Sequence, residues 1–214
     1  FYWKYKDQQQ STIFYDDYGH TTFGTRNVGS SNIKGFELET EFLAAKNTLL
    51  SADAEYLSAK TSTYVFTSPN LGGPPQFGCP SALAAGGVNY TVNCSGKTLP
   101  RSPTWSLNLG ARQTFPLSSG ARIELSGTAH YQSTTLTALE FVAPQYQDPY
   151  WLVDASLTFY SPDDRVSLGA YVNNIGNETV KATTIQTFFT PSPNNVMALL
   201  RPPRTYGIRV GTKF

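Results

Sequence analysis

The chain has 214 residues, a formal net charge of +1, and only 14% charged residues against 14% aromatic residues. Typical soluble domains carry about 25% charged residues, and the near-neutral balance gives no electrostatic reason to expect nucleic-acid binding. No run of 18 or more apolar residues is present, which excludes a transmembrane helix.

Eight segments alternate between apolar and polar residues with the period of two that is typical of β-strands. Most have ten residues or more, the length needed to cross a bilayer at a tilt, whereas soluble proteins more often use strands of about five or six residues. In chain order the segments are residues 1–15, 33–44, 48–63, 103–116, 121–132, 150–160, 164–175 and 204–214.

Short and long connections alternate between these segments. Residues 45–47, 116–120 and 161–164 have the composition of tight turns, whereas residues 16–32, 64–102, 133–149 and 176–203 are long and polar. Outer-membrane barrels have short periplasmic turns and long extracellular loops. The sequence therefore predicts an all-β fold, an antiparallel transmembrane β-barrel segment of about eight strands with that asymmetry.

The two cysteines, Cys79 and Cys94, lie in one Gly- and Pro-rich segment. This position predicts a disulfide within a long loop and an oxidising compartment, with two free thiols as the alternative. Their spacing to His20 and His130 matches no zinc pattern, so we expect neither a metal site nor a cofactor.

The first residues, Phe1 to Tyr5, already alternate, and no methionine or signal peptide precedes them. We therefore expect this sequence to be a piece of a longer chain.

Several short sequence segments resemble, in the same order along the chain, those of the C-terminal part of a TonB-dependent outer-membrane receptor barrel. The family has an aromatic strand ending near Asp-x-Gln, an Asn-x-Gly followed by a Gly-hydrophobic-Glu-hydrophobic-Glu strand, a strand beginning Pro-x-Trp, a penultimate hairpin, and a closing strand that ends in Phe. The matching residues here are 1–9, 27–39, 103–110, 150–155 with 171–178, and 203–214. Thr212 departs from the pattern, which more often has an apolar residue there.

The resemblance implies that residues 1–214 are the C-terminal part of a receptor barrel of about 22 strands, with the plug domain and earlier strands absent. It implies the outer membrane of a Gram-negative bacterium as the location, outer-membrane lipid, the plug and, through it, TonB as partners, and a scarce nutrient, such as a ferric siderophore, as the ligand. It also implies that the barrel-assembly machinery reads the last strand, through Tyr206, Ile208, Val210 and Phe214.

Charged residues on the polar sides of the strands are expected to face the lumen. Glu37, Glu39 and Glu41 form an acidic row, and candidates to balance it are Arg112, Arg122, Arg209, Lys4 and Lys213. Ser126 and His130 also share a polar side, but four residues of strand separate them by about 13 Å, too far for a nucleophile and its base. We therefore expect no enzyme.

Aromatic residues in or beside the long loops are candidates for gripping a bulky, partly apolar ligand such as an iron chelate. Packing among the loops, or a girdle at the membrane interface, is the alternative role. The candidates are Tyr15, Tyr18, His20, Tyr64, Phe66, Phe77, Tyr90, Phe188 and Phe189.

Two other architectures fit the pattern. Eight strands can close into a complete small barrel with a structural or adhesive role, in which the first and last strands would pair. A soluble β-sandwich carbohydrate-binding module would instead bury Trp105, Trp151 and Phe159 between two sheets.

Overall fold

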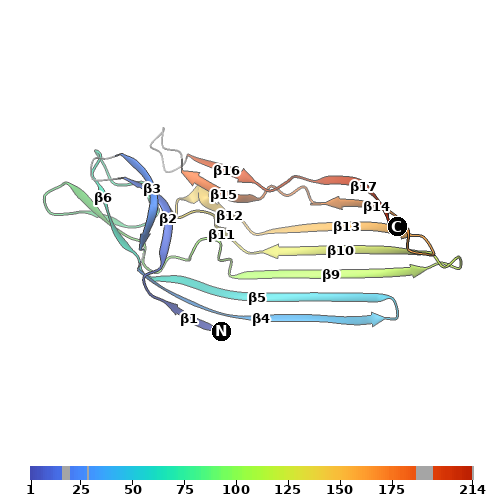
Figure 1. The fold of residues 1–214 in the computed structure, drawn as a ribbon. Coiled ribbons are helices and arrows are strands. Elements are labelled where there is room, and N and C mark those ends of the chain that lie inside the picture. Colours follow the sequence, from blue (N-terminus) through green and yellow to red (C-terminus); the bar gives the residue numbers. More distant parts are fainter. Residues whose placement is uncertain (16–19, 28, 187–194, 214) are drawn as a thin grey trace.

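One antiparallel sheet of eight strands forms the body of the protein, in the order β1-β4-β5-β9-β10-β13-β14-β17 (Figure 1). The computed structural model describes residues 1–15, 20–27, 29–186 and 195–213. The eight strands are β1 (Tyr2–Tyr5), β4 (Ser30–Ala45), β5 (Thr48–Thr63), β9 (Trp105–Pro116), β10 (Arg122–Gln132), β13 (Tyr150–Tyr160), β14 (Val166–Asn173) and β17 (Thr205–Thr212).

Each predicted strand contributes to this sheet, but the first is shorter than the sequence indicated. Asp7 adopts a positive φ of 53°, a conformation that interrupts an extended strand. The alternating residues after it form β2 (Gln9–Tyr15), which pairs with β3 (Thr21–Asn27) in a separate hairpin. The prediction of one strand over residues 1–15 was therefore wrong.

The long connections carry further short strands at one end of the sheet (Figure 1). These are β6 (Val65–Pro69), β7 (Ser81–Leu83), β8 (Asn89–Asn93), β11 (Thr135–Leu136), β12 (Tyr146–Gln147), β15 (Lys181–Gln186) and β16 (Val196–Leu200), with the 3-10 helix η1 at Ala143–Gln145. The opposite end has only tight turns, so the predicted asymmetry of the connections is present.

The turn between β13 and β14 shows how the short connections are fixed. The Ser161 hydroxyl and the Arg165 amide both donate to Asp163 Oδ1, at 2.7 and 3.2 Å. These two hydrogen bonds, the Ser161 bond first, lower the pKa of Asp163 because they favour the ionised carboxylate.

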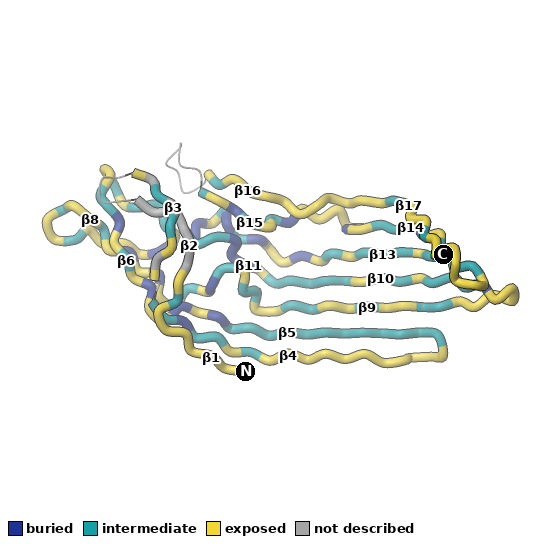
Figure 2. Tube along the Cα trace, viewed as in Figure 1, coloured by how far each residue is buried: buried dark blue, intermediate teal, exposed yellow. Residues whose placement is uncertain are grey.

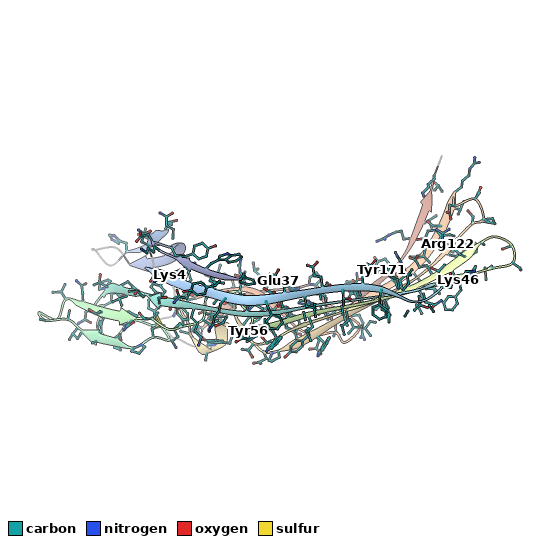
Figure 3. The ribbon with its side chains drawn as sticks, turned by 90° about the horizontal axis from the view of Figure 1, so that it is seen from below. Lys4, Glu37, Lys46, Tyr56, Arg122 and Tyr171 are labelled. Carbon is teal, nitrogen blue, oxygen red and sulfur yellow. A yellow bond between two sulfur atoms is a disulfide. The ribbon has the colours of Figure 1, made fainter. Side chains whose placement is uncertain are left out.

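Residues that lie directly opposite each other in a strand pair share a face of the sheet. The register here therefore gathers polar side chains on one face and apolar side chains on the other. One row on the polar face runs Arg112, Ser126, Ser156, Tyr171 and Gly207 through four successive strand pairs. A row on the apolar face is Leu125, Leu157, Ala170 and Ile208. Glu37 and Tyr56 accordingly project to opposite sides of the sheet (Figure 3).

The sheet is a single layer, and its apolar face is open. Trp105, Trp151 and Phe159 are 41%, 42% and 40% exposed, which contradicts a β-sandwich in which these rings are buried between sheets. Buried residues gather instead toward the loop end, while the long strands are mostly exposed or half-buried (Figure 2).

The first and last strands of the sheet lie at its two opposite edges, β1 beside β4 and β17 beside β14. In the described part of the chain no strand pair joins them, so the sheet is an open arc. This arrangement does not match a self-contained eight-stranded barrel, in which β1 and β17 would be neighbours.

Candidate functional site

The acidic row on β4 is part of a larger acidic patch. The register places Glu37 opposite Glu55 and Glu39 opposite Asp53, with Glu41 opposite Ser51. Carboxylates that stand directly opposite in a strand pair repel each other. We name Glu37, Glu39, Glu41, Asp53 and Glu55 the acidic patch; Asp53 and Glu55 were not among the predicted lumen residues.

A β-bulge creates this arrangement. The hairpin begins with Ala45 opposite Thr48, and the register shifts between Leu43 and Ala45, so that Leu43 lies opposite Leu49. A bulge adds one residue to one strand only. The shift sets Glu55 and Asp53, rather than their apolar neighbours, opposite Glu37 and Glu39. Alternation along β5 indicates its polar side, but the sequence does not indicate the bulge itself.

The arginines expected to balance the acidic row lie elsewhere on the polar face. Arg122 forms an ion pair with Asp164 at the short-turn end, and its guanidinium lies 4.1 Å from the Tyr160 ring centroid. The Arg209 guanidinium lies 5.7 Å from the Tyr171 ring centroid. Arg112 shares the polar face, opposite Ser126. No ion pair links these arginines to the acidic patch within the described residues.

Lys4 is not on the polar face. It lies opposite Asn32 in the register of β1 with β4, whereas Trp3 and Tyr5 lie opposite Ile33 and Ser31, on the side of Glu37. The prediction that Lys4 offsets the acidic row was therefore wrong. Both parities of this short strand carry aromatic residues, so alternation alone cannot assign its faces.

Arg209 and Tyr171 also border a shallow polar depression of ≈ 340 Å³ on the polar face. It is also lined by Ser126, Asp154, Ser156 and Asn173. Asp154 is held in place because its Oδ1 accepts a hydrogen bond of 2.7 Å from the Asn174 amide. The depression is therefore shallow and is lined by hydroxyl, amide and charged groups.

Ser126 and His130 have separate partners. The Ser126 hydroxyl is 2.8 Å from the Ser156 hydroxyl, and His130 Nδ1 is 2.7 Å from Asn108 Oδ1. A nucleophile and its base would instead lie within hydrogen-bond reach of each other. Ser126 and His130 are therefore not arranged as such a pair.

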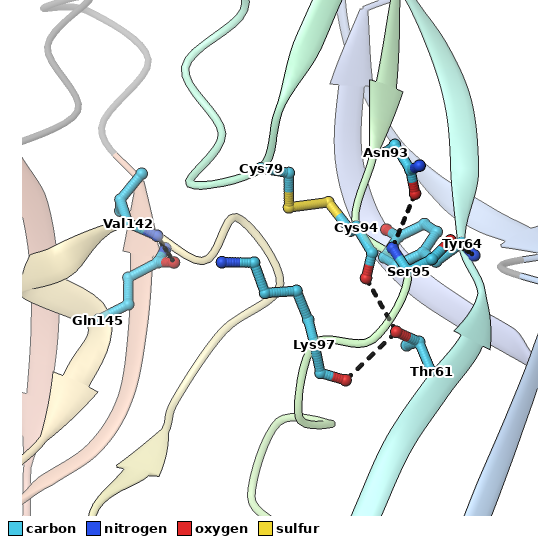
Figure 4. The surroundings of a disulfide bond; sticks show 9 residues. All are labelled: Thr61, Tyr64, Cys79, Asn93, Cys94, Ser95, Lys97, Val142 and Gln145. Atoms are coloured by element: carbon cyan, nitrogen blue, oxygen red, sulfur yellow. Dashed lines mark hydrogen bonds between the residues drawn. A yellow bond between two sulfur atoms is a disulfide. The ribbon is translucent and has the colours of Figure 1, made fainter.

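The largest loop has its own hydrophobic core around a disulfide between Cys79 and Cys94 (Figure 4). Tyr64, Val92 and Cys94 are buried there, and Phe66 and Phe77 pack against the cluster. The Thr61 hydroxyl donates to the carbonyl oxygens of Cys94 and Lys97, at 2.8 and 3.2 Å, and ties this core to the end of β5 (Figure 4). Three of the candidate ligand-binding aromatics, Tyr64, Phe66 and Phe77, therefore pack within the loop.

The remaining loop candidates are Tyr15, Tyr18, His20, Tyr90, Phe188 and Phe189. Tyr90 is half-buried on β8, opposite Ser68 of β6, and His20 is exposed. Tyr15 ends β2. Tyr18, Phe188 and Phe189 lie outside the described residues.

The third and fourth loops are joined by polar contacts. Thr137 and Thr184 hydroxyls lie 2.7 Å apart, and the Lys181 ammonium donates to the carbonyls of Pro144 and Tyr146 at 3.0 and 2.6 Å. Burial raises the pKa of the Tyr146 hydroxyl, because it disfavours the charged phenolate. Phe141, on the third loop, also enters the disulfide core of the second. The described parts of the second, third and fourth loops are thus connected to one another at this end of the sheet.

Comparison with known proteins identifies the family. The family model described as TonB dependent receptor-like, beta-barrel, matches residues 1–175. The chain belongs to this family of receptor barrels. A search of curated proteins found no match.

Solved structures show the same fold at low sequence identity. The ferric yersiniabactin uptake receptor FyuA from Yersinia pestis has a TM-score of 0.67 at 14% identity, over 100% of this chain and 26% of that receptor. The ferric preacinetobactin receptor BauA from Acinetobacter baumannii has a TM-score of 0.57 at 16% identity, over 96% of this chain and 26% of its own. The ferric-catecholate import receptor Fiu from E. coli K12 has a TM-score of 0.59 at 14% identity, over 100% of this chain and 24% of that receptor.

The chain thus spans about a quarter of the length of these receptors. Receptor barrels of this family reside in the outer membrane of Gram-negative bacteria, and the family and its structural neighbours are receptors rather than enzymes. In such a barrel the apolar face meets lipid, the polar face lines the lumen, and the long loops are extracellular.

Two further features are absent from the described residues. No helix there has both the length and the apolar character to cross a membrane. No group of three or more His, Cys, Asp or Glu side chains in that part of the chain is arranged to hold a metal ion.

The disulfide generates a testable prediction. It closes a loop with a sequence separation of 15, for which the chain-entropy estimate is about 3 kcal/mol. We expect the double variant Cys79→Ser/Cys94→Ser to keep its barrel but to be cleaved within residues 64–102 up to about a hundredfold faster, because the open loop is more populated.

Limited proteolysis of the receptor in detergent measures this effect. Reductant should accelerate cleavage of the parent protein in the same way and leave the double variant unchanged. Equal cleavage rates for the oxidised parent and the variant would contradict the role assigned to the disulfide.

Proposed function

We propose that the receptor containing this chain takes up a scarce nutrient, and that the nutrient is a ferric siderophore. Membership of the TonB-dependent receptor barrel family carries the proposal. The names of three structural neighbours, which concern ferric yersiniabactin, ferric preacinetobactin and ferric catecholates, agree with it.

In this proposal the chain supplies wall, ligand-facing loops and an assembly signal, and performs no covalent chemistry. The connected loops give the ligand a fixed extracellular surface, since the second, third and fourth loops share contacts. Tyr206, Ile208 and Val210 lie on the open apolar side of β17, with Ile208 76% exposed. This is the side on which the assembly machinery would read the last strand; Phe214 lies outside the described residues.

We further propose that the acidic patch faces the plug domain of the same receptor. Two carboxylate pairs stand directly opposite each other on β4 and β5, an arrangement that costs free energy unless cations offset it. Within the described residues no Lys or Arg forms an ion pair with the patch. A basic plug surface inside the lumen would supply the missing charge, and TonB would act on the barrel only through that plug.

Uptake of labelled ferric siderophores tests the proposed function. A strain lacking the native receptor should gain uptake of at least one ferric siderophore when the full receptor is supplied, and should lose it without TonB. We expect Tyr90→Ala to weaken binding by about fivefold, the usual threshold for a residue that matters at a binding surface. Val88→Ala, at a 70% exposed neighbouring position, is the control. Uptake independent of TonB, or none from a broad siderophore panel, would refute the proposal.

The plug contact gives a separate prediction. The double variant Glu39→Gln/Asp53→Asn removes one opposed carboxylate pair, so the plug should be released at a lower urea concentration. The barrel without its plug should be unchanged or more stable, by about 0.2–1 kcal/mol, because the repulsion is relieved.

Glu124→Gln is the matched control, since Glu124 shares the polar face but lies opposite Thr114 and Thr158. Plug release can be followed by fluorescence or by protease access to the plug. If the double variant retains its plug as tightly as the control does, the acidic patch is not the docking surface.

A further inference from the structure

Three lysines gather on the apolar face of the sheet at its loop end. Lys4 of β1 lies opposite Asn32 of β4, and Asn32 lies opposite Lys60 of β5. Lys34 lies two residues further along β4, opposite Tyr2 and Ser58. Neighbouring strands are about 4.8 Å apart, so the backbones of Lys4 and Lys60 are about 10 Å apart with Asn32 between them.

All three lysines are exposed, and none has a partner within the described residues. The ion pairs in that part of the chain belong to Arg122 and Arg165, both at the short-turn end. The Lys181 ammonium, by contrast, donates hydrogen bonds to two loop carbonyls. Three free ammonium groups therefore share one small surface.

Charge is separated across the sheet at this point. The five carboxylates of β4 and β5 lie on the polar face, and the lysines of β1, β4 and β5 lie on the other. No carboxylate side chain on the outward-facing positions of these strands offsets the lysines. Asn32, between Lys4 and Lys60, also has a buried Oδ1 without a hydrogen-bond partner.

The height of the lysines relative to the membrane follows from the neighbouring aromatic rings. Phe36, Tyr56 and Trp105 form a cluster on the apolar face, with ring centroids 5.0 to 5.9 Å apart. Aromatic girdles mark the membrane interface in outer-membrane barrels. Lys34 lies two residues, or about 7 Å, beyond Phe36 toward the loops, and Lys4 lies on the loop side of Tyr56 (Figure 3). The lysines are thus at the level of the lipid head groups.

We propose that Lys4, Lys34 and Lys60 form a binding site for the phosphate groups of lipopolysaccharide in the outer leaflet. Ammonium groups bind phosphate as point charges, and basic clusters beside a membrane span recruit anionic lipids. The site adjoins the lipid-facing surface, so a phosphate attached to acyl chains gains apolar contacts that free phosphate lacks. The proposal does not depend on which nutrient the receptor takes up.

Lipopolysaccharide binding by the full receptor in detergent tests the site. We compare the parent with the triple variant Lys4→Gln/Lys34→Gln/Lys60→Gln. A control variant, Lys46→Gln/Arg165→Gln/Lys213→Gln, removes the same charge at the short-turn end. The probes are purified lipopolysaccharide, the same lipid after removal of its phosphates, and inorganic phosphate as competitor. Heat-dependent gel mobility verifies that each barrel is folded.

We expect the triple variant to bind lipopolysaccharide about a hundredfold more weakly, or about fivefold for each lysine, and the control to bind like the parent. Dephosphorylated lipid should bind the parent as weakly as the intact lipid binds the triple variant, and added salt should weaken parent binding. Equal affinity of the triple and control variants would overturn the proposal. So would displacement of the lipid by millimolar inorganic phosphate, which would indicate a site for the free anion.

Discussion

Strand register is the constraint on which the rest of this structure depends. A side chain changes face with every residue, so a slip of one position would turn the acidic patch toward lipid. The tight hairpin after β4 starts with Ala45 opposite Thr48, a register that, if continued, would set Glu37 opposite Tyr56. The bulge between Leu43 and Ala45 moves the register by one and sets Glu37 opposite Glu55. This one extra residue keeps the polar side chains of β4 and β5 together on one face of the sheet and their apolar side chains together on the other.

The loops, rather than the sheet, contain the hydrophobic core of the chain. A wall with lipid on one side and a hydrated lumen on the other is a single layer and buries little of its own surface. The loops extend into water and must bury apolar surface among themselves. Tyr64, Val92, Phe141 and the disulfide accomplish this, which explains why several loop aromatics pack inward instead of facing a ligand.

Much of the fold could be predicted because alternation over ten or more residues is a strong signal. Strand β13 was predicted with its observed bounds, Tyr150–Tyr160. The short first strand could not be delimited, since the positive φ of Asp7 leaves no mark on the alternation around it. Asp53 and Glu55 alternate with the apolar residues of their strand, which indicates the polar side, but their pairing with Glu39 and Glu37 depends on the bulge and could not be predicted. The three lysines of the proposed site lie on three different strands, and only the register brings them together. No sequence motif therefore indicates the site.

The central claim is that this chain is an open arc of a larger receptor barrel. Spin labels at Tyr2→Cys of β1 and Tyr206→Cys of β17, in the full receptor in lipid, measure the separation of the two edges directly. Eight neighbouring strands span about 34 Å along the sheet, so an arc predicts a mean distance above about 20 Å. A distance near that of adjacent strands, about 5 to 10 Å, would mean that the ring closes on itself and would contradict the account.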